Sequence, residues 1–160
     1  MSVLAGRLFP DTNVFFAAVL NEPDTAGPAK ELLLSGRYDL WTTELVRLET
    51  ISRLWRHNRR QLGVIERAGL VADAATLFAG IVSRQAILPE IIAGAFTVTD
   101  QVRGIHAMDA LHAATATYLG AELVTLESET KPLFFVPGLR VRPLLRGSER
   151  GFARERGAGG

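Results

Sequence analysis

Four acidic residues lie far apart in the 160-residue sequence, at positions where a layered α/β domain would bring them together. Asp11 and Glu127 each come just after a short segment that reads as a strand. Glu49 lies in a helix that follows another strand, and Asp109 lies in the first turn of an alanine-rich helix. Carboxylates are ligands for Mg²⁺, and crowded acids need a cation because like charges raise one another's pKa. This set could support metal-assisted cleavage of a phosphodiester bond.

Each acid taken alone also has an ordinary structural explanation. Asp11, which precedes a threonine, could close a turn or cap a helix. Asp109 could complement the dipole at a helix start, Glu49 could be a solvated helix residue, and Glu127 could be a loop charge. The functional interpretation therefore depends on their joint placement.

Short strands alternating with helices predict an α/β fold that would position these acids. We expect a three-layer domain over residues 1–146, with a short, mostly parallel central sheet flanked by helices, and a basic, disordered tail over residues 147–160. In such sheets, ligands bind outside the carboxyl ends of the strands. The expected strands are 8–9, 38–41, 122–126 and an edge strand within 134–136 or 140–145, with 87–89 as a strand or connection. The expected helices are one from 14 to 20, one capped by Asp24 and ending near 35, one from 42 or 43 to 61, and others over 64–82, 91–102 and 107–119.

The composition excludes several classes of site. The chain has no cysteine, which rules out disulfides, cysteine-bound zinc and a thiol nucleophile. The net charge of +1 gives no global field toward nucleic acid, so the local placement of arginine matters more. No apolar run approaches the roughly 18 residues of a membrane span, and residues 1–7 do not resemble a signal peptide. We expect a cytoplasmic protein that does not associate with membranes.

Four segments together resemble the motifs of PIN-domain nucleases, in the same order and at similar spacing. The first, residues 11–14, reads Asp-Thr-Asn-Val after an apolar strand, and the second, 42–49, runs from a strand into a helix that carries Glu49. The third, 109–116, reads Asp-Ala-Leu-His-Ala-Ala-Thr-Ala, and the fourth, 123–127, is a strand that ends in Thr-Leu-Glu. The resemblance spans roughly residues 5 to 145.

This resemblance implies an endoribonuclease that depends on Mg²⁺, with Mn²⁺ as an alternative ion. Its catalytic residues and metal ligands would be Asp11, Glu49, Asp109 and Glu127. A single-domain chain of this size is most similar to the VapC-like toxins of bacterial type II toxin–antitoxin pairs. The implied partners are an RNA substrate, a cognate antitoxin and a second copy of the chain. The sequence departs from the family at Glu127, where Asp is more frequent, and at Pro10, which we expect at the very end of its strand.

Glu44 and Glu49 compete for the role of the second acid. Glu44 falls in the first turn of its helix, where a negative charge suits the dipole, so it has a good structural explanation. Glu49 lies deeper, on one face with a row of arginines and beside an apolar face that we expect to pack on the sheet. The family motif also selects Glu49. The apolar face is formed by Leu48, Ile51, Trp55 and Leu62, and the arginine row by Arg53, Arg56 and Arg60.

The arginine row has two interpretations of similar weight. It is either a solvated face with an ion pair between Glu49 and Arg53, or a track that binds RNA phosphates. Among the supporting polar residues, Asn13 could hydrogen-bond a carboxylate, and Thr12 and Thr125 carry hydroxyls near the predicted site.

His112 could act as an acid or base, but it is better explained as a packed histidine with a structural hydrogen bond. The alanines 113, 114 and 116 would let their helix approach the sheet and bring Asp109 toward Asp11. The apolar residues of 64–82 could form an antitoxin or dimer surface, although core packing is their default explanation.

Other functions remain open at this stage. A phosphatase with Asp11 as nucleophile needs an acid two residues later, but that position is Asn13, which cannot transfer protons. A non-catalytic PIN-like binding module would fit the substitution at Glu127 but not four intact acids. A DNA nuclease of related fold would usually carry further helical insertions.

Overall fold

The computed structural model describes residues 6–57 and 62–144, and its central feature is a five-stranded sheet. The strands are β1 (Arg7–Pro10), β2 (Asp39–Thr42), β3 (Ser83–Arg84), β4 (Glu122–Thr125) and β5 (Val141–Pro143). Their order is β3-β2-β1-β4-β5, and every neighbouring pair is parallel. The predicted α/β class is confirmed, and the sheet is entirely rather than mostly parallel.

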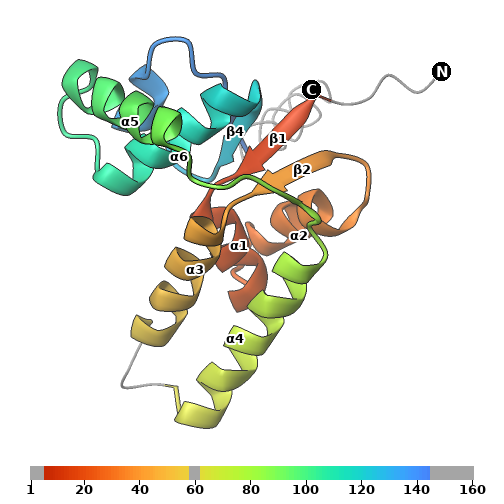
Figure 1. The fold of residues 1–160 in the computed structure, drawn as a ribbon. Coiled ribbons are helices and arrows are strands. Elements are labelled where there is room, and N and C mark those ends of the chain that lie inside the picture. The colour runs from red at the N-terminus through yellow and green to blue at the C-terminus, as the bar shows by residue number, and fades with distance from the viewer. Residues whose placement is uncertain (1–5, 58–61, 145–160) are drawn as a thin grey trace, which may run out of the picture.

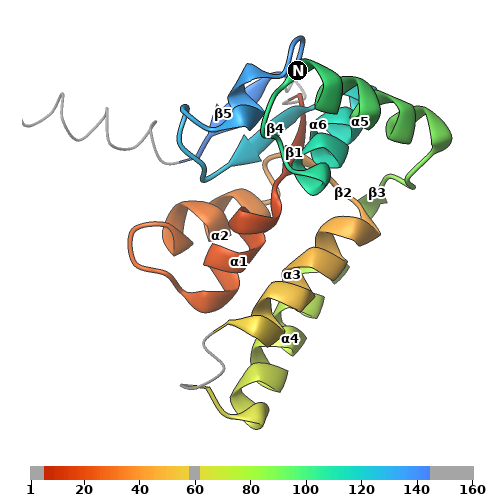
Figure 2. The same cartoon turned by 90° about the vertical axis from the view of Figure 1, so that its left-hand side faces the viewer.

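Helices cover both faces of this sheet and form the outer layers. They are α1 (Thr12–Leu20), α2 (Ala26–Leu34), α3 (Glu44–Arg56), α4 (Val64–Ala79), α5 (Pro89–Gln101), α6 (Ala107–Leu119) and the short 3-10 helix η1 (Pro132–Phe135). The pair α5 and α6 lies on one side of the sheet, and α1 to α4 lie on the other (Figures 1 and 2). Helices α3 and α4 pack side by side and extend away from the sheet. Among residues 6–57 and 62–144, no helix is long and apolar enough to cross a membrane.

The core joins the central strand to helices on both faces. Leu8 and Phe9 of β1 are fully buried, and Phe15 of α1 stacks on Phe78 of α4 with ring centroids 4.3 Å apart. Each such side chain contributes about 1.5–3 kcal/mol when it is fully buried. Small residues bring α6 close to its neighbours: Ala113, Ala114 and Ala116 are buried, as the sequence predicted.

The central strand ends at the point where the predicted site begins. Pro10 is the last residue of β1, as expected, and it pairs with Val124 of β4. On the other side, the pairing with β2 involves only Arg7 and Leu8, so the missing N–H of Pro10 removes no ladder hydrogen bond. The next N–H, that of Asp11, donates to the Val124 carbonyl at 2.8 Å and extends the ladder by one residue.

Two predicted boundaries, those at Asp24 and at residue 82, are wrong, and the structure decides two alternatives that the sequence left open. Asp24 does not cap α2: its φ is +66°, and Thr25 holds the N-cap position. The helix predicted over 64–82 ends at Ala79 because Gly80 takes the C-cap, and the residues that follow form β3. Residues 87–89 are a connection in which Pro89 starts α5. The segment 134–136 is no strand, since η1 runs through it, and β5 is the edge strand.

The predicted packing of α3 is also wrong. Leu48 is 64% exposed and Trp55 40% exposed, while the buried residues of the helix are Val46, Thr50 and Leu54. The reason is that α3 packs on α1 and α4 rather than lying flat on the sheet. The helix ends at Arg56 instead of residue 61. Arg60, the rest of 58–61, and the predicted domain end and tail from 145 to 160 lie outside the described residues.

Candidate active site

The site is built around Asp11, which the structure buries at the carboxyl end of the central strand. Asp11 is 4% exposed and occupies the N-cap of α1. Its Oδ1 accepts the N–H of Thr12 at 2.7 Å, and its Oδ2 accepts the hydroxyl of Thr125 at 3.2 Å. The carboxylate is therefore fixed at the junction of β1 and α1, next to the end of β4.

The hydroxyl of Thr125, the last residue of β4, hydrogen-bonds to residues that follow both β1 and β4. Its fully buried hydroxyl donates to Asp11 and accepts from the Asn13 amide at 3.0 Å and from the Glu127 N–H at 3.1 Å. Asn13 also accepts the N–H of Leu126 through its side-chain oxygen at 3.1 Å. Both ends of the Asn13 amide are thus engaged in holding the loop that carries Glu127, which argues against the acid–base role that a phosphatase needs at this position.

Glu49 reaches the same region from α3. Its Oε2 accepts the Thr12 hydroxyl at 2.7 Å and lies 2.8 Å from Nε2 of His112. The competing acid, Glu44, lies elsewhere: it is exposed and forms ion pairs with Arg47 and Arg84. Of the two candidates for the second acid, only Glu49 contacts the residues around Asp11.

Asp109 and Glu127 are half-buried and complete the set of predicted acids. Asp109 lies in the first turn of α6, as predicted, and Glu127 lies just beyond β4. Among residues 6–57 and 62–144, no three acidic or histidine side chains come close enough to form a preassembled metal cluster. The four acids nevertheless influence one another's ionisation, so they lie within electrostatic range of one another.

Three of the acids have pKa values above those of ordinary carboxyl groups. Burial raises the pKa of Asp11, which the charge of Glu49 raises further, while nearby His112 and two hydrogen bonds oppose the rise. Burial and the charge of Asp11 raise the pKa of Asp109. Burial and the charges of Asp109 and Asp11 raise the pKa of Glu127. Burial is the main cause in all three cases, and the proximity of the other acids adds to it.

The pKa of Glu49, unlike those of the other three acids, is lowered, and the pKa of its partner His112 is raised. Burial acts to raise the pKa of Glu49, but hydrogen bonds from His112 and Thr12 and the charges of His112 and Arg53 lower it below its ordinary value. Burial acts to lower the pKa of His112, but its hydrogen bond to Glu49 and the surrounding carboxylates raise it. Glu49 is therefore held as an ionised acceptor.

The donor set suits a hard divalent cation. Such ions bind carboxylate oxygens and water, and Mg²⁺ usually keeps several waters, so it does not require every acid in direct contact. The pKa values of Asp11, Asp109 and Glu127 are raised first by burial and then by the charges of neighbouring acids, and a bound cation would favour their ionised forms. Asp11, Glu49, Asp109 and Glu127 are the residues that could hold the ion.

Of the two described arginines of the predicted row, Arg53 is the one whose charge acts on the acids. Its guanidinium lies over the ring of Phe16, 4.6 Å from the centroid, and its charge lowers the pKa of both Glu49 and Glu127. Arg56 is exposed, and its Nε donates to the carbonyl of Ser52 at 3.2 Å. The structure thus distinguishes Arg53 from a simple solvated residue, whereas Arg56 remains on the outer surface.

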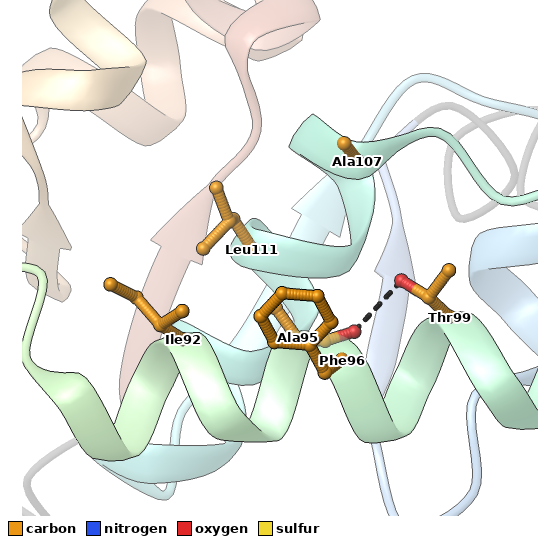
Figure 3. Close-up of a pocket in the computed structure, with 6 residues that line it drawn as sticks. All are labelled: Ile92, Ala95, Phe96, Thr99, Ala107 and Leu111. Atoms are coloured by element: carbon orange, nitrogen blue, oxygen red, sulfur yellow. Dashed lines mark hydrogen bonds between the residues drawn. The ribbon is translucent and has the colours of Figure 1, made fainter.

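An apolar hollow lies between α5 and α6, and none of the four acids lines it. Its volume is about 160 Å³, and its lining residues are Ile92, Ala95, Phe96, Thr99, Ala107 and Leu111 (Figure 3). The one hydroxyl in this lining, that of Thr99, donates to the Ala95 carbonyl at 2.9 Å. The hollow therefore offers no free polar group for catalysis.

His112 is a packed histidine with a structural hydrogen bond, as the sequence predicted. It lies three residues after Asp109 on α6 and is 1% exposed. The predicted structural hydrogen bond exists, but its partner is Glu49. The spacing from Asp109 was visible in the sequence, whereas the approach of α3 from the other side of the site was not.

Residues 8–131 match the family model described as PIN domain. No curated protein matches the sequence. Among solved structures, the chain is similar to VapBC2 from Rickettsia felis bound to a promoter DNA fragment, with 16% identity and a TM-score of 0.64 over 86% of this chain and 98% of that chain.

It is also similar to FitAcB from Neisseria gonorrhoeae, with 18% identity and a TM-score of 0.64 over 87% of this chain and 99% of that one. A third similar structure is VapC20 from Mycobacterium tuberculosis, described as a sarcin-ricin loop cleaving toxin. That comparison gives 22% identity and a TM-score of 0.62 over 85% of this chain and 99% of the other. At these identities the likeness establishes a shared fold.

Proposed function

This chain belongs to the PIN domain family, and we propose that it is an endoribonuclease that depends on Mg²⁺, with Mn²⁺ as an alternative ion. One observation carries the proposal: acids from four separate elements are electrostatically coupled around the buried Asp11 at the carboxyl end of the sheet. The catalytic residues and metal ligands are Asp11, Glu49, Asp109 and Glu127.

The protein's contribution is to hold these carboxylates at fixed positions. Asp11 is fixed by two hydrogen bonds, and Glu49 by Thr12 and His112. When bound, the divalent ion polarises a phosphoryl oxygen and lowers the pKa of a coordinated water. Because Asp109 and Glu127 have raised pKa values, they retain protons more readily without the ion, and metal affinity therefore increases with pH.

Arg53 provides the positive charge for an RNA phosphate near the acids. Its guanidinium lies over the Phe16 ring, and arginine can bind a phosphate through two parallel hydrogen bonds. Arg56, which is exposed one turn further along α3, would extend the contact to a neighbouring phosphate. Single-stranded or looped RNA is the favoured substrate, because its bases can be splayed out.

We further propose that the chain is the toxin of a toxin–antitoxin pair. The support is its fold, shared with VapBC2, FitAcB and the toxin VapC20. Exposed apolar side chains on α3 and α4 offer surface for a cognate antitoxin or a second copy of the chain. They are Leu48, Trp55, Val64 and Ile65. Growth arrest on expression, relieved by Asp11→Asn, is the expected result; unimpaired growth with active protein present would contradict this assignment.

The nuclease proposal is tested with purified full-length chain, free of any partner. It is incubated with structured RNA in Mg²⁺, beside the variants Asp11→Asn and Asp109→Asn. Asp73→Asn is the matched control, because Asp73 is exposed on α4, outside the predicted acid set. We expect cleavage by the wild type and the control, which EDTA stops and both site variants abolish.

Metal binding measured by calorimetry decides between the remaining alternatives. Cleavage that persists in both Asp11→Asn and Asp109→Asn would assign the activity to another site or a contaminant. Absence of both cleavage and Mg²⁺ or Mn²⁺ binding in the wild type would favour a non-catalytic PIN-like binding module. A phosphorylated Asp11 trapped from a phosphate monoester would instead favour the phosphatase.

A further inference from the structure

A buried histidine connects the two helices that carry the second and third acids. His112 of α6 is 1% exposed, and its ring packs near Phe9 with centroids 6.0 Å apart. Its Nε2 lies 2.8 Å from Oε2 of Glu49, on α3. Since the ionised Glu49 can only accept, the ring nitrogen donates this hydrogen bond.

A second buried donor ends on the same oxygen. The hydroxyl of Thr12, 1% exposed, donates to Oε2 of Glu49 at 2.7 Å. One carboxylate oxygen has two lone pairs, so these donors occupy both. The hydrogen bonds that Glu49 receives from the described residues both end on Oε2. Among these residues, no hydrogen bond ends on the other oxygen, Oε1, which keeps its lone pairs for a cation.

We propose that His112 and Thr12 are positioning residues that make Glu49 a ligand through one oxygen only, and that they thereby favour Mg²⁺ or Mn²⁺ over Ca²⁺. The inference rests on the proposed metal site. Ca²⁺ accepts six to eight oxygens and often takes both oxygens of one carboxylate, whereas Mg²⁺ requires near-octahedral geometry from single oxygens. When both lone pairs of Oε2 are already used, Glu49 can offer a single oxygen. This suits Mg²⁺ and does not suit binding of Ca²⁺ through both oxygens.

The two donors also fix a side chain that would otherwise be mobile. A glutamate has three rotatable bonds, and its rotamer entropy must be lost when it binds a metal. Thr12 and His112 both hold Oε2 of Glu49, so this entropy is already lost when the protein folds and is not lost again when the metal binds. Because Asp109 and His112 lie three residues apart on α6, the same helix turn supplies one acid and orients another.

Calorimetry of the full chain with Mn²⁺, Mg²⁺ and Ca²⁺, each alone, tests this inference. His112→Leu and Thr12→Val remove one donor each, whereas His112→Gln and Thr12→Ser keep a donor close to the original atom. Thr115→Val is the matched control: Thr115 is buried on α6, and its hydroxyl donates to the Leu111 carbonyl instead of to Glu49.

We expect His112→Leu and Thr12→Val to weaken Mn²⁺ and Mg²⁺ binding by about 10-fold or more, with a smaller loss for Ca²⁺. His112→Gln and Thr12→Ser should recover most of the affinity, and the control should match the wild type. Rescue by donor-retaining side chains distinguishes orientation of Glu49 from a general loss of packing.

Thermal unfolding of each variant shows whether it is folded, so that misfolding is not mistaken for a loss of metal affinity. If His112→Leu does not fold, Thr12→Val, which preserves the side-chain shape, carries the comparison. Folded variants whose Mn²⁺ affinity stays within about twofold of the wild type would overturn the inference and leave the nuclease proposal intact. Equal losses of affinity for Mn²⁺, Mg²⁺ and Ca²⁺ would overturn the proposed preference for Mg²⁺ or Mn²⁺ over Ca²⁺. A wild type that binds none of the ions would overturn both proposals together.

Discussion

Replacement of Thr125 by valine should destabilise the protein through hydrogen bonds alone. Valine has nearly the shape of threonine, so the substitution removes the hydroxyl and leaves packing almost unchanged. That hydroxyl is fully buried and makes three hydrogen bonds: to Asp11 at 3.2 Å, from Asn13 at 3.0 Å and from the Glu127 N–H at 3.1 Å. Its loss leaves one acceptor and two donors without their partner.

The size of the effect follows from where those partners lie. A buried polar group left unpaired costs about 1–3 kcal/mol. Asp11 is buried, but Asn13 and Glu127 are half-buried, so water can replace part of what they lose. We therefore expect a total loss of about 2–4 kcal/mol in the free energy of unfolding. For a chain of this size, that corresponds to a fall in melting temperature of roughly 5–15 °C.

Chemical and thermal unfolding of Thr125→Val and Thr125→Ser, measured in EDTA, provides the assay. Serine keeps the hydroxyl and loses one buried methyl, which costs about 1 kcal/mol, so it should be the milder change. Thr117→Val is the control, because Thr117 is exposed and its hydroxyl bonds only to the Ala113 carbonyl. If valine were as stable as wild type, or milder than serine, Thr125 would be a packing residue and the hydrogen-bond network would have no energetic role.

Three further predictions concern charge. The raised pKa values of Asp11, Asp109 and Glu127 mean that their protonation favours the folded state, so this contribution is lost as pH rises through them. Unfolding in EDTA, followed upward from the ordinary carboxyl pKa values of 3.8 to 4.5, should show falling stability, to which His112, whose pKa is also raised, contributes with the same sign; Asp109→Asn should make the fall shallower and Mn²⁺ should offset it, and an identical slope for the variant would contradict this prediction. Arg53→Gln, measured by RNA anisotropy on an Asp11→Asn background, should reduce the salt dependence of binding by about one phosphate contact, whereas Arg37→Gln should not; equal slopes would leave Arg53 as a solvated residue. Glu44→Gln should keep metal binding and cost less than about 1 kcal/mol, because Glu44 is exposed, whereas Glu49→Gln should lose the metal; the reverse result would reassign the second acid.

The sequence predicted the features that depend on local pattern. Hydrophobic runs and glycine stops located β1, β2, β4 and α6, and the Asp-Thr-Asn and Asp-Ala-Leu-His segments identified the family. The position of Pro10 followed from its missing N–H. These predictions succeeded because each requires only neighbouring residues and one physical rule.

The features that the sequence did not predict depend on how elements meet. The apolar face assigned to Leu48 and Trp55 assumed that α3 lies on the sheet, but α3 packs on α1 and α4 and leaves both exposed. The partner of His112 is 63 residues away and comes from a helix on the other side of the site. Helical periodicity gives the faces of one helix and says nothing about which element covers each face.

Three consecutive residues at the start of α1 explain why the site can be compact without a preformed cluster. Asp11 lies at the centre, Thr12 reaches across to Glu49 on α3, and Asn13 reaches to the Leu126 N–H beside Glu127. Because these side chains leave one short segment in different directions, the geometry of the second and fourth acids is set relative to the first. Asp109 approaches from α6, and His112 connects that helix to Glu49. A change at the start of α1 would therefore shift several of the acids at once. Thr12→Val should lower the affinity for metal more than it lowers the stability of the fold.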